Sequence, residues 1–232
     1  MTKLGIVCGL AFEAAIIKRA VKQTLPANAP LIACSGPGPS RARTAASILA
    51  DQGSEALLSF GISGGLDPGL ATGTVIIATG LANGSKQNCD EQWSTRLYKS
   101  LKPDFDARYA PLAGAKSVLS TTTEKLALFR SSGAAAIDME SSGIAEAAAE
   151  KGLPFVALRV ICDTADVTIP PIAISAMGNN GRIRILATAF QSSANPSQIP
   201  DLVRLARRTA DARQVLKSLA SFGLLGMFRA FG

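Results

Sequence analysis

The sequence predicts an α/β layered fold, on the basis of two observations. Short apolar, β-prone segments alternate with longer segments in which apolar residues recur at helical spacing. Such alternation is typical of parallel βαβ units, in which helices cover the faces of a sheet. The composition, with 47% hydrophobic and 18% charged residues over 232 positions, allows a well-buried core and excludes an intrinsically disordered protein.

The first half of the chain contains four short apolar segments that we predict as strands, at residues 4–9, 31–35, 56–61 and 74–79. Helices are predicted at 12–24 and 41–52, where apolar residues recur at a period near 3.6. The second helix follows a turn-rich loop of Gly, Pro and Ser that could cap it. Residues 82–111 are polar and rich in Gly, Asn and Lys, and we interpret them as surface loops around a helix at 93–101.

The second half continues the alternation. We expect a strand end at 117–119, a helix at 124–131, a strand at 134–138, an Ala-rich helix at 141–151 and a strongly β-prone strand at 155–162. From residue 201 onward, Leu and Ala recur at helical spacing while arginines ride mostly on the other face, which predicts a basic amphipathic helix and an apolar tail over 201–232. No Pro-rich linker or internal repeat divides the chain, so we expect one domain over residues 1–232.

Charge and cysteine content argue against several functional classes. The net charge is +7, but no run of five or more Lys or Arg occurs and aromatic residues make up only 5%, so nucleic-acid binding is not expected. The four cysteines lie far apart and the chain has no histidine, which argues against a metal site and favours free thiols in a reducing compartment. We also expect neither a signal peptide nor a transmembrane helix.

Three acidic residues stand near the ends of predicted strands. Glu13 lies just inside the first helix, Glu140 follows a strand end at Asp138, and Asp163 comes directly after the strand at 155–162. A helix-dipole charge is the structural interpretation of Glu13. For Asp138 it is a cap of the next helix, which would leave Glu140 free. An acid at the end of an apolar strand is partly desolvated, so we favour a functional role for Asp163.

The carboxyl ends of parallel strands meet at one crevice, so we expect Glu13, Glu140 and Asp163 to share a site. Because the chain contains no histidine, acid–base chemistry must lean on carboxylates, lysine, tyrosine, cysteine or water, and a buried acid can carry a proton near neutral pH. Cleavage of a ribosyl–purine bond needs a base for water, an acceptor for the ribose diol and an acid for the leaving base. Three carboxylates could perform this chemistry, as paired carboxylates do in glycosidases.

A glycine pair provides the other candidate. Ser63 and Gly64 belong to the segment Ile62-Ser63-Gly64-Gly65, directly after a predicted strand. Backbone N–H groups freed by the glycines could hold an anion or the edge of a ring, and a simple turn that needs glycine dihedrals explains the segment equally well. No GxGxxG motif opens a helix and no GxxxxGK[ST] motif exists, so no nucleotide cofactor is expected.

Four segments, in order along the chain, resemble the nucleoside phosphorylase/nucleosidase superfamily, and especially its methylthioadenosine/S-adenosylhomocysteine nucleosidases. They are Gly5-Ile6-Val7 with Glu13, Gly61-Ile62-Ser63-Gly64-Gly65-Leu66, Asp138-Met139-Glu140, and Cys162-Asp163-Thr164-Ala165-Asp166. The resemblance implies a three-layer α/β/α sandwich with a central mixed, mostly parallel sheet. It also implies a cytoplasmic homodimer or higher homo-oligomer.

The resemblance further implies roles for individual residues. Glu13 looks like the acid that positions the attacking water, and Asp163 like the acid that protonates or hydrogen-bonds purine N7. Met139 and Glu140 look like the ribose-binding pair, with Glu140 on the 2′ and 3′ hydroxyls. Ser63, Gly64, Met139 and Glu140 are therefore the expected substrate-binding residues, Glu13 and Asp163 the catalytic ones, and no metal is implied.

The later part of the chain is similar to the hopanoid-associated phosphorylase family, in Ile169-Pro170-Pro171, Gly181-Arg182 and the Pro200-Asp201-Leu202 start of the basic helix. That similarity implies removal of adenine from adenosylhopane in bacterial hopanoid synthesis. Because a hopane body resides in a membrane, the basic helix and apolar tail could lie on the anionic inner face of the membrane. The alternative is that the helix packs on its own sheet or on a second subunit.

The nucleophile is the remaining question. Hexameric phosphorylases bind phosphate with Arg and Ser around a Gly-Ser-Cys-Gly motif. The corresponding positions here look like Ser59 and Ile62, and neither residue can replace those phosphate contacts. Hydrolysis with Glu13 as the water base is therefore favoured, although Arg41 or Arg43 could supply a phosphate contact. The alternatives are a soluble methylthioadenosine/S-adenosylhomocysteine nucleosidase, a phosphate-dependent purine nucleoside phosphorylase, and a non-catalytic nucleoside-binding protein.

Overall fold

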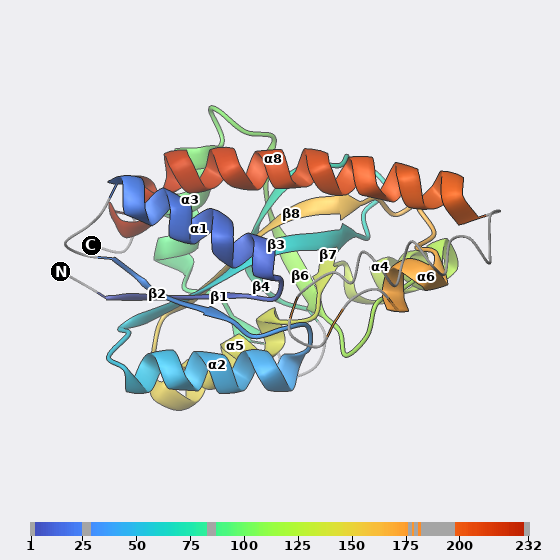
Figure 1. Ribbon diagram of the computed structural model, residues 1–232. Coiled ribbons are helices and arrows are strands. Elements are labelled where there is room, and N and C mark those ends of the chain that lie inside the picture. The colour runs from blue at the N-terminus through green and yellow to red at the C-terminus, as the bar shows by residue number, and fades with distance from the viewer. Residues whose placement is uncertain are drawn as a thin grey trace.

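The structure, a computed structural model, is built on a mixed β-sheet with helices on both faces (Figure 1). It describes residues 3–24, 29–82, 87–175, 178, 181 and 198–229, without the side chains of 24, 87 and 223–229. The strands are β1 (Leu4–Cys8), β2 (Leu31–Cys34), β3 (Ala56–Gly65), β4 (Val75–Leu81), β5 (Gln87–Asn88), β6 (Ala107–Gly114), β7 (Ala136–Asp138) and β8 (Phe155–Asp163). The helices are α1 (Ala11–Thr24), α2 (Pro39–Asp51), α3 (Glu91–Leu101), α4 (Thr122–Ser132), α5 (Ser141–Lys151), α6 (Pro171–Ser175) and α8 (Ile199–Arg229).

The strand order of the sheet is β2-β1-β3-β7-β6-β4-β5, and β8 pairs with both β3 and β4. β8 runs parallel to β3 and antiparallel to β4, while β7 is antiparallel to β3 and parallel to β6. The strands β3, β7, β6, β4 and β8 therefore close into a ring, from which β1 and β2 extend as a parallel wing. The predicted α/β fold with a central mixed sheet is confirmed, and the ring is a feature that the sequence pattern did not predict.

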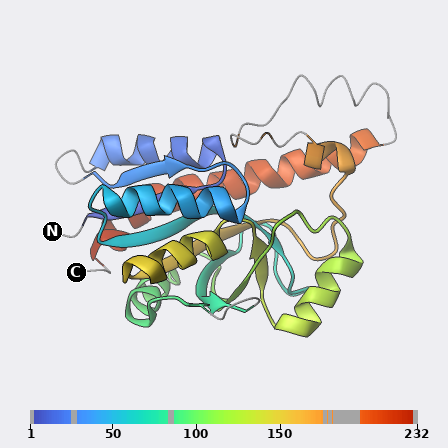
Figure 2. The same cartoon turned by 90° about the horizontal axis from the view of Figure 1, so that it is seen from below.

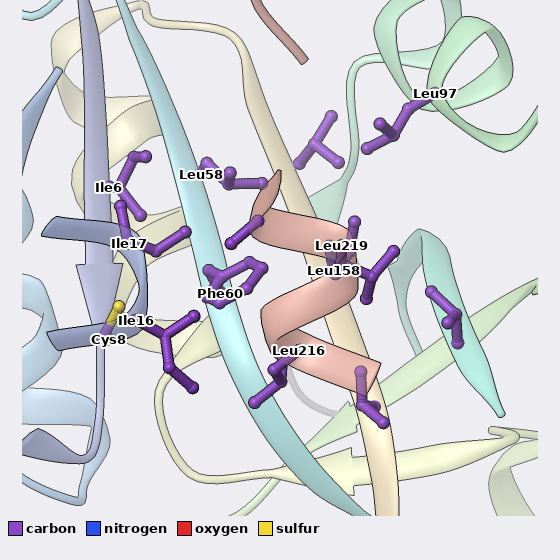
Figure 3. Packing of buried hydrophobic residues seen from close by; sticks show 14 of the residues in the cluster. Ile6, Cys8, Ile16, Ile17, Leu58, Phe60, Leu97, Leu158, Leu216 and Leu219 are labelled. Atoms are coloured by element: carbon purple, nitrogen blue, oxygen red, sulfur yellow. The ribbon is translucent and has the colours of Figure 1, made fainter. Parts of the chain in front are cut away.

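Helices α1 and α8 lie on one face of the β1–β3–β8 region, and α2 and α5 lie on the other (Figures 1 and 2). On the first face, Ile17 of α1, Phe60 of β3 and Leu216 of α8 belong to one buried cluster (Figure 3). On the second face, a Cβ at Gly143 of α5 would lie only 1.9 Å from the carbonyl oxygen of Pro39 in α2. The absence of a side chain at Gly143 thus allows α2 and α5 to pack closely against each other.

The basic helix α8 is part of this core. Ala212, Leu216 and Leu219 on its apolar face are fully buried, and the Arg213 guanidinium lies 5.2 Å from the centroid of the Phe12 ring. For this half of the helix, packing on its own sheet is the interpretation that the structure bears out. The tail side chains beyond residue 222 are outside the described residues. In the part of the chain that is described, no helix is long and apolar enough to cross a bilayer.

Three segments differ from the sequence prediction. Residues 107–111, which were expected in surface loops, belong to β6. This strand gains its stability from pairing with β4 and β7, while its own sequence contains a strand-weakening proline. The strand end expected at 117–119 is wrong, since β6 stops at Gly114. The segment 62–65 continues β3 instead of forming a turn, and Gly64 and Gly65 pair there with β7.

Candidate active site

A pocket of about 700 Å³ opens at the carboxyl ends of β3, β7 and β8. Its polar end contains Glu13, Glu140 and Asp163, which are 1%, 7% and 7% exposed. The mouth is marked by more exposed apolar side chains, with Ile199 at 42% and Val203 at 44%. Helix α8 provides the longest stretch of the apolar wall, through Ile199, Leu202, Val203, Leu205, Ala206 and Thr209.

Glu13 is held in place by two backbone N–H groups. Its Oε2 accepts a hydrogen bond from Leu10 N at 2.8 Å, and its Oε1 accepts one from Ile62 N at 2.9 Å. Burial raises the pKa of Glu13 above its usual value, against the lowering effect of Arg159 and of these N–H groups. A surface charge at a helix N-terminus needs neither this burial nor two backbone donors, so the surroundings of Glu13 favour a further role for its carboxylate.

Arg159 of β8 joins the carboxylates, and the sequence interpretation did not single it out. Its side chain is 1% exposed and forms ion pairs with Asp138 and, at 3.6 Å, with Glu140 Oε2. A Cβ at Gly61 would lie 2.5 Å from both Arg159 Nη1 and Glu13 Oε1, so only glycine leaves room for these two groups. Burial alone would lower the pKa of Arg159, but the surrounding carboxylates raise it above its usual value. The sequence did carry a signal for Arg159, because it is a charged residue within an otherwise apolar strand. Such a charge needs a buried partner of opposite sign.

Asp138 supports this arrangement from the start of α5. Its Oδ1 accepts a hydrogen bond from Ser141 N at 3.2 Å, so Asp138 satisfies the first backbone donor of α5, as its capping interpretation predicted. Its Oδ2 contacts the Ser141 hydroxyl and Arg159. Ser59 is fully buried and accepts a hydrogen bond from Arg159, so this hydroxyl belongs to the support of the arginine and does not line the pocket.

Glu140 and Met139 both line the pocket directly after Asp138. Burial raises the pKa of Glu140 to about 8, with Arg159 opposing the shift and the neighbouring carboxylates adding to it. The carboxylate rests on the backbone of Gly9, where a Cβ would lie 2.7 Å from Glu140 Oε1. Glu140 is therefore a buried acceptor at the pocket surface whose charge depends on its surroundings.

Asp163 ends β8 and pairs with a buried lysine that the sequence interpretation also missed. Lys125 Nζ of α4 lies 2.5 Å from Asp163 Oδ2, and the lysine side chain is 1% exposed. The same Nζ donates to the carbonyl oxygens of Thr164, at 2.9 Å, and Val167, at 2.8 Å. Burial raises the pKa of Asp163, whereas Lys125 lowers it. The sequence gave no signal of this pair, because Lys125 stands in an ordinary helical pattern that does not indicate which residue it contacts.

Ser63 and Gly64 also line the pocket, from within β3. Ser63 Oγ is buried and has no hydrogen-bond partner among the described residues. A Cβ at Gly64 would lie 3.2 Å from Asp163 Oδ2, so glycine at this position lets β3 approach the carboxylate. The neighbouring Ile62 N–H donates to Glu13, so this N–H of the segment serves the carboxylate.

The arginines considered as phosphate ligands point elsewhere. Arg43 pairs with Glu150 of α5, and Arg41 Nη1 donates to the Pro37 carbonyl oxygen at 2.9 Å. Neither arginine lines the pocket. Arg182 of the predicted Gly181-Arg182 motif lies outside the described residues.

Comparison with known proteins agrees with this fold. A sequence model of a family described as the phosphorylase superfamily matches residues 3–190.

The futalosine hydrolase of Helicobacter pylori is similar with a TM-score of 0.71 and 16% identity, over 98% of this chain and 97% of that one. The 5′-methylthioadenosine/S-adenosylhomocysteine nucleosidase of Neisseria meningitidis, in complex with methylthio-immucillin-A, has a TM-score of 0.69 and 14% identity, over 95% of this chain and 99% of that one. The corresponding nucleosidase of Campylobacter jejuni has a TM-score of 0.66 and 18% identity, over 89% and 99% of the two chains. A search of curated protein sequences finds no match.

Proposed function

Because the chain belongs to the phosphorylase superfamily, we propose that it cleaves the N-glycosidic bond of an adenine nucleoside by hydrolysis. The observation that carries this proposal is the meeting of three buried carboxylates, Glu13, Glu140 and Asp163, in one largely apolar pocket. Two of the similar solved structures are nucleosidases and the third is a futalosine hydrolase, which supports the same reaction class. The carboxylates then divide the required roles among them.

In the proposed reaction, water attacks C1′ of the ribose as the bond between C1′ and N9 breaks. Ionised Glu13 takes a proton from the water, and protonated Asp163 gives its proton to N7 of the leaving adenine. Glu140 accepts hydrogen bonds from the 2′ and 3′ hydroxyls, with Met139 against the sugar. The products are adenine and a free sugar, and the proton gained by Glu13 returns to Asp163 through solvent. Burial suits Asp163 to this role because it raises the pKa of that carboxyl toward neutrality.

The charges around the pocket favour water over phosphate as the nucleophile. Within the described residues, the ionisable groups that line the pocket are Lys125, the Cys162 thiol and four acids, Glu13, Asp138, Glu140 and Asp163. The three N–H groups of Lys125 are all engaged within the protein. A phosphate dianion would therefore find no uncommitted cation among the groups that line the pocket, whereas a neutral water can donate a hydrogen bond to Glu13.

We further propose adenosylhopane as the substrate, because the pocket extends along an apolar wall beyond its polar end. Leu202 and Leu205 of α8 form part of that wall, together with Ile169 and Ala173. A nucleoside bound at the carboxylates would direct a 5′ substituent along such a surface, and burial of a large hydrocarbon contributes about 25 cal/mol for each Å² removed from water. A soluble 5′-thio nucleoside is the alternative substrate, since it uses the same polar end.

The decisive experiment measures free adenine and the sugar product from adenosylhopane in detergent and from 5′-methylthioadenosine, each with and without phosphate. We expect adenine and a free ribosyl product that do not depend on phosphate, with the higher kcat/KM for adenosylhopane. Adenine only in the presence of phosphate, with a ribose 1-phosphate product, would contradict hydrolysis. A preference for methylthioadenosine would contradict the lipid substrate, and no adenine from either would contradict the reaction.

A lipid substrate requires access from a bilayer, and we propose that the mouth end of α8 rests on an anionic membrane surface. Ile199 and Val203 are exposed at the mouth, and the Arg204 side chain beside them is 73% exposed. Arg207, one turn further along, is also exposed. Apolar side chains flanked by arginines favour an interfacial position, and each basic residue near an anionic surface adds about 1 kcal/mol of attraction.

Reversing the charges of Arg204 and Arg207 tests this contact. The double variant Arg204→Glu/Arg207→Glu is expected to lose at least about tenfold in binding to phosphatidylglycerol-rich vesicles, measured by co-sedimentation. Its turnover of detergent-dispersed substrate should stay unchanged, because neither arginine lines the pocket. The control Lys22→Glu/Lys99→Glu makes the same change in net charge on exposed positions of α1 and α3. Equal vesicle binding by both double variants would contradict the proposed orientation.

A further inference from the structure

Lys125 is a buried charge that the proposed mechanism leaves unused. It is the only buried residue of α4, a position where an apolar side chain would satisfy packing alone. Burying an ammonium costs free energy unless its partners compensate. Here the compensation comes from Asp163 and two backbone carbonyls, so this lysine is committed entirely to the segment that carries the proposed acid.

We propose that Lys125 is a positioning residue that directs the proton of Asp163 toward the purine. The inference rests on the proposed function. Because Lys125 Nζ donates to Asp163 Oδ2, the hydroxyl hydrogen of a protonated Asp163 belongs on Oδ1, the oxygen that Lys125 leaves free. The acid thus presents its O–H to the ligand with one orientation, whereas an unpaired carboxyl would divide its proton between two oxygens.

The same contact assists the transfer step. As the C1′–N9 bond breaks, its electron pair moves to the base, the Oδ1–H bond of Asp163 breaks, and a new N7–H bond forms. The Asp163 carboxylate that results is stabilised by the ammonium of Lys125. The attraction between the two groups strengthens as the negative charge develops in a low-dielectric site. Lys125 makes no contact with the reacting atoms in this scheme, and it acts through Asp163.

Other charged groups near Asp163 are arranged differently. Arg208 of α8 donates to the hydroxyl of Thr164 at 2.7 Å, and it lowers the pKa of Asp163 less than Lys125 does. The exposed Asp166 accepts a hydrogen bond from Thr164. Burial raises the pKa of Asp163, which favours its protonated form, while Lys125 opposes this shift and favours release of the proton. Lys125 is the charged partner that contacts the carboxylate directly.

The test compares Lys125→Gln, which keeps a donor but removes the charge, with Lys125→Ala, which removes both. For adenine release we expect kcat to fall about 10²-fold in Lys125→Ala, within the range for general acid catalysis, and less in Lys125→Gln. Without the ammonium the pKa of Asp163 rises, so the loss of kcat/KM with increasing pH should move to higher pH in both variants. Methylamine or ethylamine added to Lys125→Ala should restore part of the lost rate.

The matched control is Lys151→Met, which removes a lysine that also pairs with an aspartate, Asp51, at 2.6 Å but on the surface. It should leave the rate and the pH profile unchanged. Wild-type pH profiles in both Lys125 variants, or a folded Lys125→Ala that amines do not rescue, would overturn the inference and leave the proposed function standing. Absence of adenine release by the wild-type enzyme would instead overturn the proposed function and this inference with it.

Discussion

Replacement of Glu13 by glutamine is expected to lower kcat for adenine release by about 10²- to 10⁴-fold, the range that general acid–base catalysis contributes. Glutamine has nearly the same shape and can still accept a hydrogen bond from one backbone N–H, but its amide cannot take a proton from water. KM should change little, because the ribose and purine contacts are assigned to Glu140 and Asp163. Steady-state kinetics with chromatographic detection of adenine measure both quantities.

The control for this variant is Glu91→Gln. Glu91 also stands in the first turn of a helix, but it is exposed in α3 and away from the pocket. If Glu13 acted only on the helix dipole, the two substitutions would have equally small effects. Wild-type kcat in a folded Glu13→Gln variant would therefore return Glu13 to that structural role, and circular dichroism establishes whether the variant is folded.

The pH dependence provides a second criterion for the same residue. A base must be ionised, so the rate should fall as the pH drops through the pKa of Glu13. Burial raises that pKa, which places the acid limb of kcat/KM above the value of about 4.3 that is usual for glutamate. Glu13→Gln should lack this limb in its residual activity. A limb that persists unchanged in the variant would assign the titration to another group.

The gathering of the three acids could be predicted from the sequence because it depends on local signals. Each of Glu13, Glu140 and Asp163 lies within a few residues of the end of a recognisable apolar strand. For Glu13 and Asp163 the strands β1 and β8 both run parallel to β3, and parallel strands carry such ends to one edge of the sheet. Glu140 follows β7, which is antiparallel to β3 but also ends at the pocket. The glycine segment before Leu66 was located, with a ligand-holding loop and a simple turn as equal alternatives, but it continues β3. Its true role depends on β7 and on Asp163, which approach from distant parts of the chain.

The partners of the acids could not be predicted in the same way. Arg159 is visible as a charge within an apolar strand, but its pairing with Asp138 depends on how β7 and β8 are brought together around the ring. Lys125 lies 38 residues before its partner Asp163, on a helix whose position follows from β6, the strand that was taken for loops. The positions of Arg159 and Lys125 relative to their partners thus depend on how distant strands pair. The periodicity of apolar residues along the sequence carries no information about that pairing.

Arg159 should also be the residue whose loss is most damaging to the fold. Arg159→Met removes the guanidinium that pairs with Asp138 and Glu140 and that donates to the hydroxyls of Ser59 and Ser141. Asp138 is 1% exposed in its side chain, so its carboxylate would remain in the interior without its cationic partner. Breaking a buried ion pair in this way costs about 3–5 kcal/mol of unfolding free energy.

Urea unfolding at neutral pH measures this loss as a decrease in the midpoint at constant slope. The exposed pair of Arg43 with Glu150 supplies the control, since Arg43→Met should cost no more than about 1 kcal/mol.

The double variant Arg159→Met/Asp138→Asn removes both charges. Its loss of unfolding free energy should be smaller than the sum of the losses of the two single variants, because no carboxylate then remains unpaired at residue 138. Strict additivity in this cycle, or a cost for Arg159→Met as small as that of Arg43→Met, would show that the buried pair of Arg159 and Asp138 does not stabilise the fold. The expected coupling would mean that one buried guanidinium both orders the carboxylates of the site and ties β8 to the start of α5.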